Sequence, residues 1–225
     1  MERGRRMIYA EYRYTGDERM PAVVSLGVRE TPVWTQQLWD DGEYSEFIVR
    51  NGCGHCCAAM ALTFFGVPTN PHEEYALCRE LWGAPEIVGH ERQANFQSVS
   101  GIAKILRHKG IPADVFGVPS RGEAIEKILS ALKSGRLVIF ESHPREDNPD
   151  NPFSKGDHWV MAVGYTEDGK ILVANSSGKV PGNGINLVDE ATIADALYLG
   201  ADPEDYTWGE WRDEFIHGVG YIIVG

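Results

Sequence analysis

The stretch that decides the fold is NGCGHCCAAMAL, residues 51–62, which joins a cysteine between glycines to a strong helical pattern. Residues 58–62 favour a helix, and Gly66 followed by Pro68 supplies a stop signal. We therefore expect a helix that begins near Cys53, with small residues that let it pack deep in the protein. The letters Cys-Gly-His-Cys are compatible with redox exchange, metal binding or a single nucleophile.

The composition is that of a soluble globular protein. The chain has 225 residues, of which 43% are hydrophobic and 24% charged, with a net charge of −12. This charge argues against a surface for nucleic acid or anionic membrane. No apolar run approaches the roughly 18 residues of a membrane span. A basic start without a following apolar segment predicts no signal peptide, so we expect a cytoplasmic protein or the mature part of an exported one.

The patterns along the chain predict an α+β protein. Helices are expected mainly in the first part and strands mainly in the second, which disfavours a parallel doubly wound sheet. Strands are expected at 8–14 and 22–28 as a hairpin, at 33–39 as a strand or extended segment, and near 114–118, 136–143, 158–165, 170–175 and 219–225. Helices are expected at 53–66, 71–82, 98–109, 122–135 and 189–199, with polar turns at 40–52 and 145–157 and a turn at 182–184.

Redox and zinc chemistry both fit the cysteine cluster poorly. A thioredoxin-like site would use Cys53 and Cys56, but Gly52 replaces the usual tryptophan and Cys57 adjoins the pair. A zinc site needs four ligands, typically from two separated pairs, and none of the other residues completes such a set. We therefore expect no metal and no cofactor.

A nucleophilic role for Cys53 fits better. A helix N-terminus stabilises a thiolate through its dipole and its free amides, which predicts a lowered pKa for this thiol. Gly52 and Gly54 leave the sulfur accessible to a substrate carbonyl. Cys56 and Cys57 are then residues of the helix core.

A base and an orienting group are available in the second half of the chain. His158 begins the strand HWVMAVGY after the glycine-containing loop at Gly156. Asn175 ends the next strand, and the turn between the two strands can bring it back to His158. An Asn oxygen in that position can accept a hydrogen bond from the imidazole and fix its tautomer.

Three segments in order resemble the bacteriocin-processing (double-glycine leader peptidase-like) branch of papain-like cysteine peptidases. NGCGHCCAAMAL resembles the nucleophile helix of that group, ALKSGRLVIFESHP its middle segment, and SKGDHWVMAVGYTEDGKILVANSS its histidine hairpin. The match runs from about Val33 to Ser176. One departure is His55, which replaces the usual proline and bears on substrate preference.

The resemblance implies a papain-like fold, with the nucleophile helix packed on an antiparallel sheet, in a single catalytic domain spanning 1–225 with an N-terminal hairpin extension at 1–32. It implies a cysteine peptidase with a Cys–His–Asn triad and a glutamine that binds the oxyanion. The implied catalytic residues are Cys53, His158, Asn175 and Gln37, with Gln36 as the other candidate glutamine. The implied substrate-binding residues, which contact a peptide or protein substrate, are Gly52, Gly54, Gly156, Asp157 and His143.

Three other functions stay open at this point. An acyl or γ-glutamyl transferase could use the same triad, because an acyl-enzyme can pass to an amine or a thiol as well as to water. A thiol–disulfide oxidoreductase would use Cys53 and Cys56. A binding domain with a decayed site is opposed by the complete set of catalytic residues. The sequence does not predict the oligomeric state.

Overall fold

The computed structural model describes residues 8–42, 45–82, 99–118, 120–143, 151–178, 182–197 and 220–225. The strands are β1 (Ala10–Tyr14), β2 (Ala22–Leu26), β3 (Arg29–Val33), β4 (Ala113–Phe116), β5 (Leu137–Ser142), β6 (His158–Tyr165), β7 (Ile171–Ala174), β8 (Ile185–Val188) and β9 (Tyr221–Val224). The helices are α1 (Ser45–Asn51), α2 (Cys53–Phe64), α3 (Pro71–Trp82), α4 (Val99–His108), α5 (Arg121–Lys133) and α6 (Glu190–Ala196), with a short 3₁₀ helix η1 (Gln36–Leu38).

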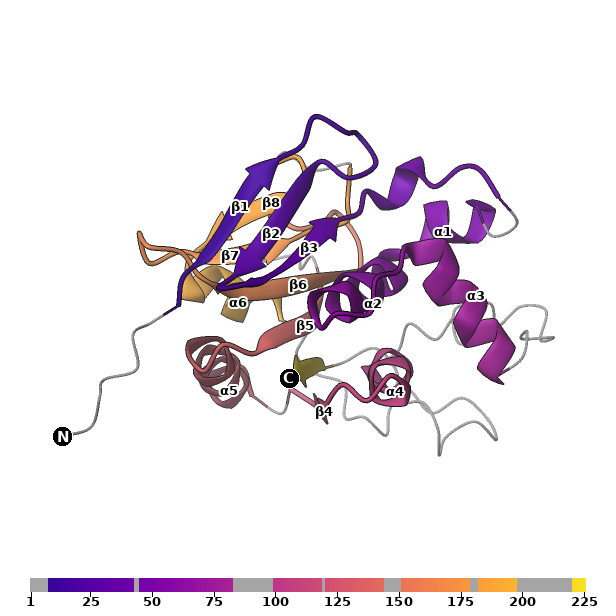
Figure 1. Ribbon diagram of the computed structural model, residues 1–225. Helices are drawn as coiled ribbons and strands as arrows, with labels where there is room; N and C mark the ends of the chain where they lie inside the picture. Colours follow the sequence, from indigo (N-terminus) through magenta and orange to yellow (C-terminus); the bar gives the residue numbers. More distant parts are fainter. Residues whose placement is uncertain are drawn as a thin grey trace.

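A six-stranded sheet in the order β4-β9-β5-β6-β7-β8 forms the centre of the protein. All of its neighbouring strands are antiparallel. The last strand of the chain, β9, lies between β4 and β5, so the C-terminal segment is held inside the sheet (Figure 1). The predicted α+β class, with its antiparallel rather than doubly wound sheet, is confirmed.

A separate three-stranded sheet, β1-β2-β3, packs against the larger one. The predicted hairpin is present as β1 and β2. Gly164 of β6 allows the close approach, because a Cβ there would lie 3.2 Å from Leu26 and 3.4 Å from Ala10. The third strand begins earlier than predicted, after a turn at Gly27, whose φ of 64° suits glycine. It lies at the edge of its sheet, which tolerates Pro32, a residue that cannot donate to a ladder.

Three further elements correct the sequence prediction. Instead of a strand over 33–39, the chain leaves β3 and turns into η1, where the amide of Gln36 donates to the carbonyl of Ser176. Instead of a polar turn over 40–52, the chain forms α1, in which Ile48 is fully buried. The sequence prediction also missed β8, which follows the predicted turn at 182–184.

Helix α2 packs against both β3 and β6, so it lies beside the small sheet on the same face of the large sheet (Figure 1). Nearly all of its side chains are buried, as the run of small residues predicts. One core lies on this face of the large sheet and includes residues of α2, α4 and the small sheet. A second core lies on the opposite face and includes residues of α5 and α6. Helix α2 is therefore held from several sides.

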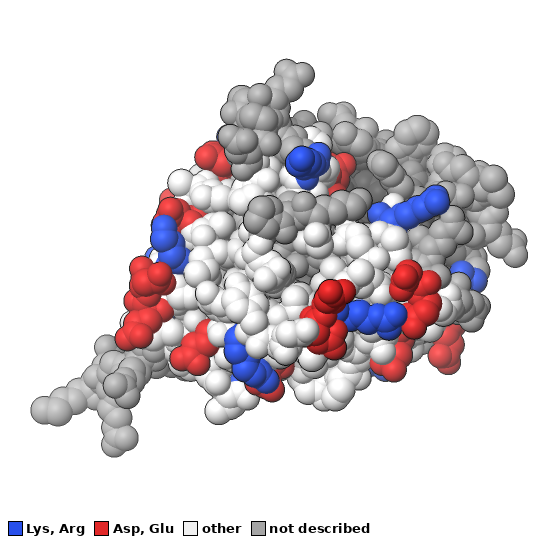
Figure 2. Space-filling model, turned by 90° about the horizontal axis from the view of Figure 1, so that it is seen from above, with Lys and Arg blue, Asp and Glu red and all other residues white. Residues whose placement is uncertain are grey.

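On the face drawn in Figure 2, acidic and basic side chains of the described residues lie around the edge and leave a largely uncharged centre. Among the residues that the structure describes, no helix is long and apolar enough to span a membrane.

Candidate active site

Cys53 is the first residue of α2, as predicted, and it is the partly exposed member of the four cysteines. Cys56, Cys57 and Cys78 are fully buried, and none of the four cysteines forms a disulfide bond. A reactive thiol must be reached by its substrate. Exposure therefore distinguishes Cys53 from the other three, and the burial of Cys56 disfavours its use as a resolving thiol.

Gly52 fixes the approach of the chain to Cys53. Its amide donates to the carbonyl of Ile48 at 2.8 Å, which joins the end of α1 to the start of α2. A Cβ at this position would lie 2.5 Å from the same carbonyl oxygen. Only glycine fits there without a shift of the backbone, so Gly52 fixes how the chain enters α2 at Cys53.

His158 and Asn175 come together across the β6–β7 hairpin, as the sequence predicts. Nε2 of His158 lies 2.8 Å from Oδ1 of Asn175, and both side chains are buried. The backbone of Trp159, which directly follows His158, hydrogen-bonds the sulfur of Cys53. The start of β6 is therefore adjacent to the start of α2.

The contacts of Asn175 decide the tautomer of His158. Nδ2 of Asn175 donates to the carbonyl of Phe153 at 3.0 Å and to Oδ1 of Asn186 at 2.8 Å. Oδ1 accepts from the amide of Ser177 at 2.9 Å, so this oxygen is the atom that faces the ring. The ring nitrogen Nε2 must then carry a proton, which leaves Nδ1 as the acceptor of a neutral imidazole.

Phe153 and Asn186 were not predicted as site residues. Phe153 acts through its backbone carbonyl, which sequence reasoning cannot identify. Asn186 gives a weak signal, since asparagine is unusual within a strand, but that strand was itself missed.

Burial dominates the titration of the two central groups. It raises the pKa of the Cys53 thiol to about 11; the carboxyl of Glu141 adds to the rise, and hydrogen bonds from the backbone of Trp159 and Gly54 oppose it. Burial lowers the pKa of His158 to about 4, partly offset by the hydrogen bond with Asn175. The predicted lowering of the Cys53 pKa is therefore wrong for this structure, because desolvation outweighs the helix terminus.

Both candidate glutamines lie near the residues that follow Asn175. Gln36 is buried, and its Nε2 donates to the carbonyl of Val49 at 3.3 Å. Gln37 accepts at Oε1 from the amide of Gly178 at 2.7 Å, which orients its amide group. The two contacts differ in kind: the Gln36 amide nitrogen already donates within the protein, whereas Gln37 is held through its oxygen.

The other predicted contact residues fall into two groups. Gly54 is buried in the first turn of α2, whereas Gly156 is exposed in the loop before β6. His143 follows β5, and its Nδ1 contacts Oδ1 of Asp157. The residues that directly follow His143, 144–150, lie outside the described residues.

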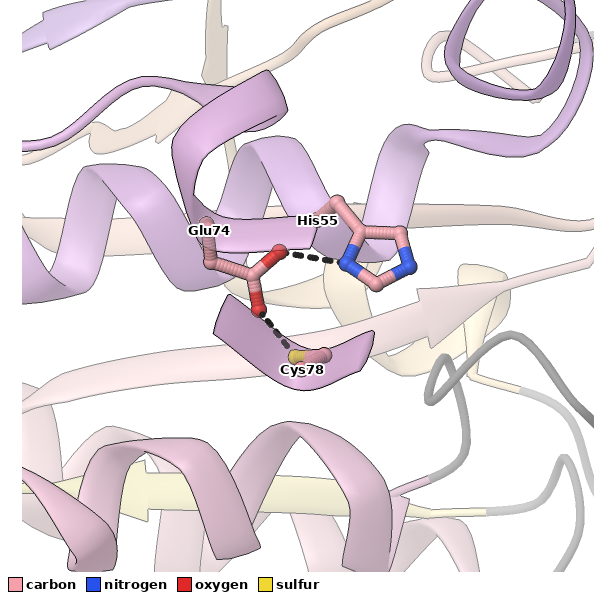
Figure 3. A group of neighbouring side chains, drawn as sticks. All are labelled: His55, Glu74 and Cys78. Atoms are coloured by element: carbon pink, nitrogen blue, oxygen red, sulfur yellow. Dashed lines mark hydrogen bonds and ion pairs between the residues drawn. The ribbon is translucent and has the colours of Figure 1, made fainter. Parts of the chain in front are cut away.

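A buried polar group joins α2 to α3 (Figure 3). Nδ1 of His55 contacts Oε2 of Glu74, and the thiol of Cys78 donates to Oε1 of the same carboxylate at 3.2 Å. The ligand-capable atoms of these three residues lie within 4.8 Å of one another. They could hold a metal only as a three-ligand set, and in the structure they satisfy one another. His55 is thus held by its contact with Glu74.

Comparisons with known proteins first define the class: the chain is a cysteine peptidase with an α+β papain-like fold. More particularly, it belongs to the Peptidase_C39 like family, whose profile matches residues 29–194. A solved structure of a C39-like peptidase from Bacillus anthracis aligns over 77% of this chain and 88% of its own, with a TM-score of 0.45 and 14% identity. No curated protein matches the sequence. The matched residues include Cys53, His158 and Asn175.

Proposed function

We propose that the protein hydrolyses peptide bonds through a triad of Cys53, His158 and Asn175. The observation that carries the proposal is the hydrogen bond from Nε2 of His158 to Oδ1 of Asn175, at 2.8 Å. It leaves Nδ1 as a base at the start of β6, where the next residue, Trp159, already contacts the nucleophile. A neutral imidazole held in one tautomer is what general-base activation of a thiol requires.

The raised thiol pKa and lowered imidazole pKa favour proton transfer during attack rather than a preformed ion pair. Nδ1 of His158 takes the thiol proton as the sulfur of Cys53 bonds to the substrate carbonyl carbon. The imidazolium then gives this proton to the leaving amine as the C–N bond breaks, which leaves a thioester. His158 next removes a proton from water, whose oxygen attacks the thioester and releases the acid and the free thiol.

Gln37 is the glutamine that we assign to the oxyanion. Its oxygen is fixed by Gly178, which directs the amide nitrogen away from that contact, whereas the nitrogen of Gln36 donates to Val49. The backbone amide of Cys53 is the second proposed donor. Loss of one oxyanion donor lowers the rate by roughly 10²–10³ in comparable sites.

The test is single-turnover cleavage of a mixed peptide library by the wild type and matched variants. We expect Cys53→Ala and His158→Ala to lose turnover most, Gln37→Ala to lose roughly 10²–10³ and Asn175→Ala least. The losses for cysteine and histidine should not add, because the two act as one unit.

Cys56→Ala and His108→Ala are the controls, since each removes the same kind of group outside the site. His108 is exposed at the end of α4, and both variants should cleave like the wild type. Wild-type turnover in Cys53→Ala would refute the proposed nucleophile. A larger loss for Gln36→Ala than for Gln37→Ala would reverse the assignment of the glutamine.

A further inference from the structure

Glu141 is a carboxyl group that the proposed chemistry does not use. It lies near the end of β5, directly opposite Trp159 in the β5–β6 ladder. Side chains alternate along a strand, so Glu141 shares a face with Leu137 and Ile139, which belong to the core around α2. Its side chain therefore projects toward the nucleophile helix.

The carboxyl group of Glu141 lies beside the nucleophile. Its charge raises the pKa of Cys53, so the two groups are within electrostatic reach. Trp159, its partner across the ladder, hydrogen-bonds the same sulfur through its backbone. Two independent features, strand register and electrostatic coupling, thus place Glu141 at the reacting end of α2.

One oxygen of this carboxyl has no partner in the described part of the chain. Oε2 of Glu141 is buried and makes no hydrogen bond to the residues that the structure describes. A buried polar atom without a partner destabilises the folded protein, and for a carboxylate the penalty is large. A substrate group that donates to Oε2 would remove this penalty on binding.

The charge around Glu141 indicates which kind of donor fits. The negative charge of Asp157 acts on Glu141 and raises its pKa. Asp157 itself already has His143 as a partner. Among the residues that the structure describes, Glu141 is therefore the carboxyl of the two that lacks a counter-ion. A neutral donor would leave the ionised form of Glu141 opposed by the charge of Asp157, whereas a cation would offset that repulsion.

We propose that Glu141 selects a lysine or arginine side chain of the substrate that flanks the scissile bond. This inference rests on the proposed peptidase function and adds its substrate class. The partner is a basic peptide, recognised by a charge-assisted hydrogen bond to Oε2 in a partly desolvated site.

The selection should depend on pH. Burial, and then the charge of Asp157, raise the pKa of Glu141 to about 8, so the free site holds a largely neutral acid at pH 7. A cation binds the ionised form, so preference for it should strengthen as pH rises through about 8. Among the described residues, the other titratable groups that act on or lie beside Glu141 are Cys53 on α2 and the His143–Asp157 pair.

The first experiment compares peptides that carry arginine or its neutral isostere citrulline at each of three positions on either side of the cleaved bond. We expect the wild type to prefer arginine at one position by at least tenfold in kcat/KM, the effect of one charged hydrogen bond. Glu141→Gln should reduce this preference to about twofold or less. The control Glu126→Gln removes an exposed carboxyl on α5 and should keep it.

A second readout needs no cleavable peptide. We would measure alkylation of Cys53 by cationic 2-bromoethylammonium and by neutral iodoacetamide, and compare the ratio of the two rates between variants. The ratio cancels any change in thiol pKa that Glu141→Gln causes. We expect it to fall at least about fivefold in Glu141→Gln and to be unchanged in Glu126→Gln.

The two readouts separate the possible failures. If the alkylation ratio falls as expected but no peptide is cleaved, the cation site stands and the proposed peptidase reaction fails. If peptides are cleaved without any preference for arginine and the ratio is the same in both variants, the role of Glu141 is overturned while the peptidase function stands. An equal loss for arginine and citrulline peptides would also overturn it.

Discussion

Cys53 shows how burial can outweigh a helix terminus. The helix start and the neighbouring amides favour a thiolate, yet desolvation raises the pKa of the thiol to about 11. His158 responds in the opposite direction, with its pKa lowered to about 4. Both groups are then neutral at pH 7, and the same desolvation that suppresses their charges would strengthen a hydrogen bond between them.

This balance predicts the pH profile of thiol reactivity. The alkylation rate of Cys53 by iodoacetamide should keep rising with pH from 6 to 10, since the thiolate fraction grows toward a pKa of about 11. Mass spectrometry of the alkylated peptide checks the site, and Cys53→Ala is the control. A plateau that begins near pH 4 would instead indicate a thiolate–imidazolium pair in the resting protein.

The elements that the sequence predicted well are those with a strong local pattern. The periodic helices and the β6–β7 hairpin agree with the structure to within a few residues. Helix α1 was missed because it is short and begins in a polar segment. Strand β8 was missed because its burial depends on pairing with β7. The candidate site residues were predicted from local signals, namely the start of a helix, the start of one strand and the end of the next. Glu141, by contrast, becomes significant only through its register opposite Trp159.

The contact between α2 and α3 predicts a large stability effect. Glu74 bonds both His55 and Cys78, and the His55–Glu74 pair is almost fully buried. Glu74→Ala would leave both partners without their acceptor, so we expect a loss of about 3–5 kcal/mol in the free energy of unfolding. Urea denaturation measures it, with exposed Glu80→Ala on the same helix as the control. Equal effects of the two substitutions would show that the buried group contributes little.

At the scale of the whole molecule, two buried ionisable groups act on stability in opposite directions. His158 is held neutral, so stability falls as pH decreases from 6.5 toward 4, where only the unfolded chain takes up this proton. Glu141 is also held neutral, but as an acid. The folded protein keeps its proton up to a pKa of about 8, whereas the ordinary value is 4.5. Stability therefore falls as pH rises between these two values. A buried base lowers stability at acidic pH and a buried acid lowers it at higher pH, so together they narrow the pH range of highest stability.

The contribution of Glu141 can be isolated by difference. Glu141→Gln removes the titrating acid and keeps the shape, so its stability relative to the wild type should increase by about 2–4 kcal/mol between pH 5 and pH 8. The effect of His158 is common to both proteins and cancels. Urea denaturation at the two pH values provides the measurement, and Glu126→Gln should show the same small difference at both. If the difference for Glu141→Gln were also independent of pH, Glu141 would be ionised and paired in the free protein. It would then have no unmatched charge with which to select a cationic substrate.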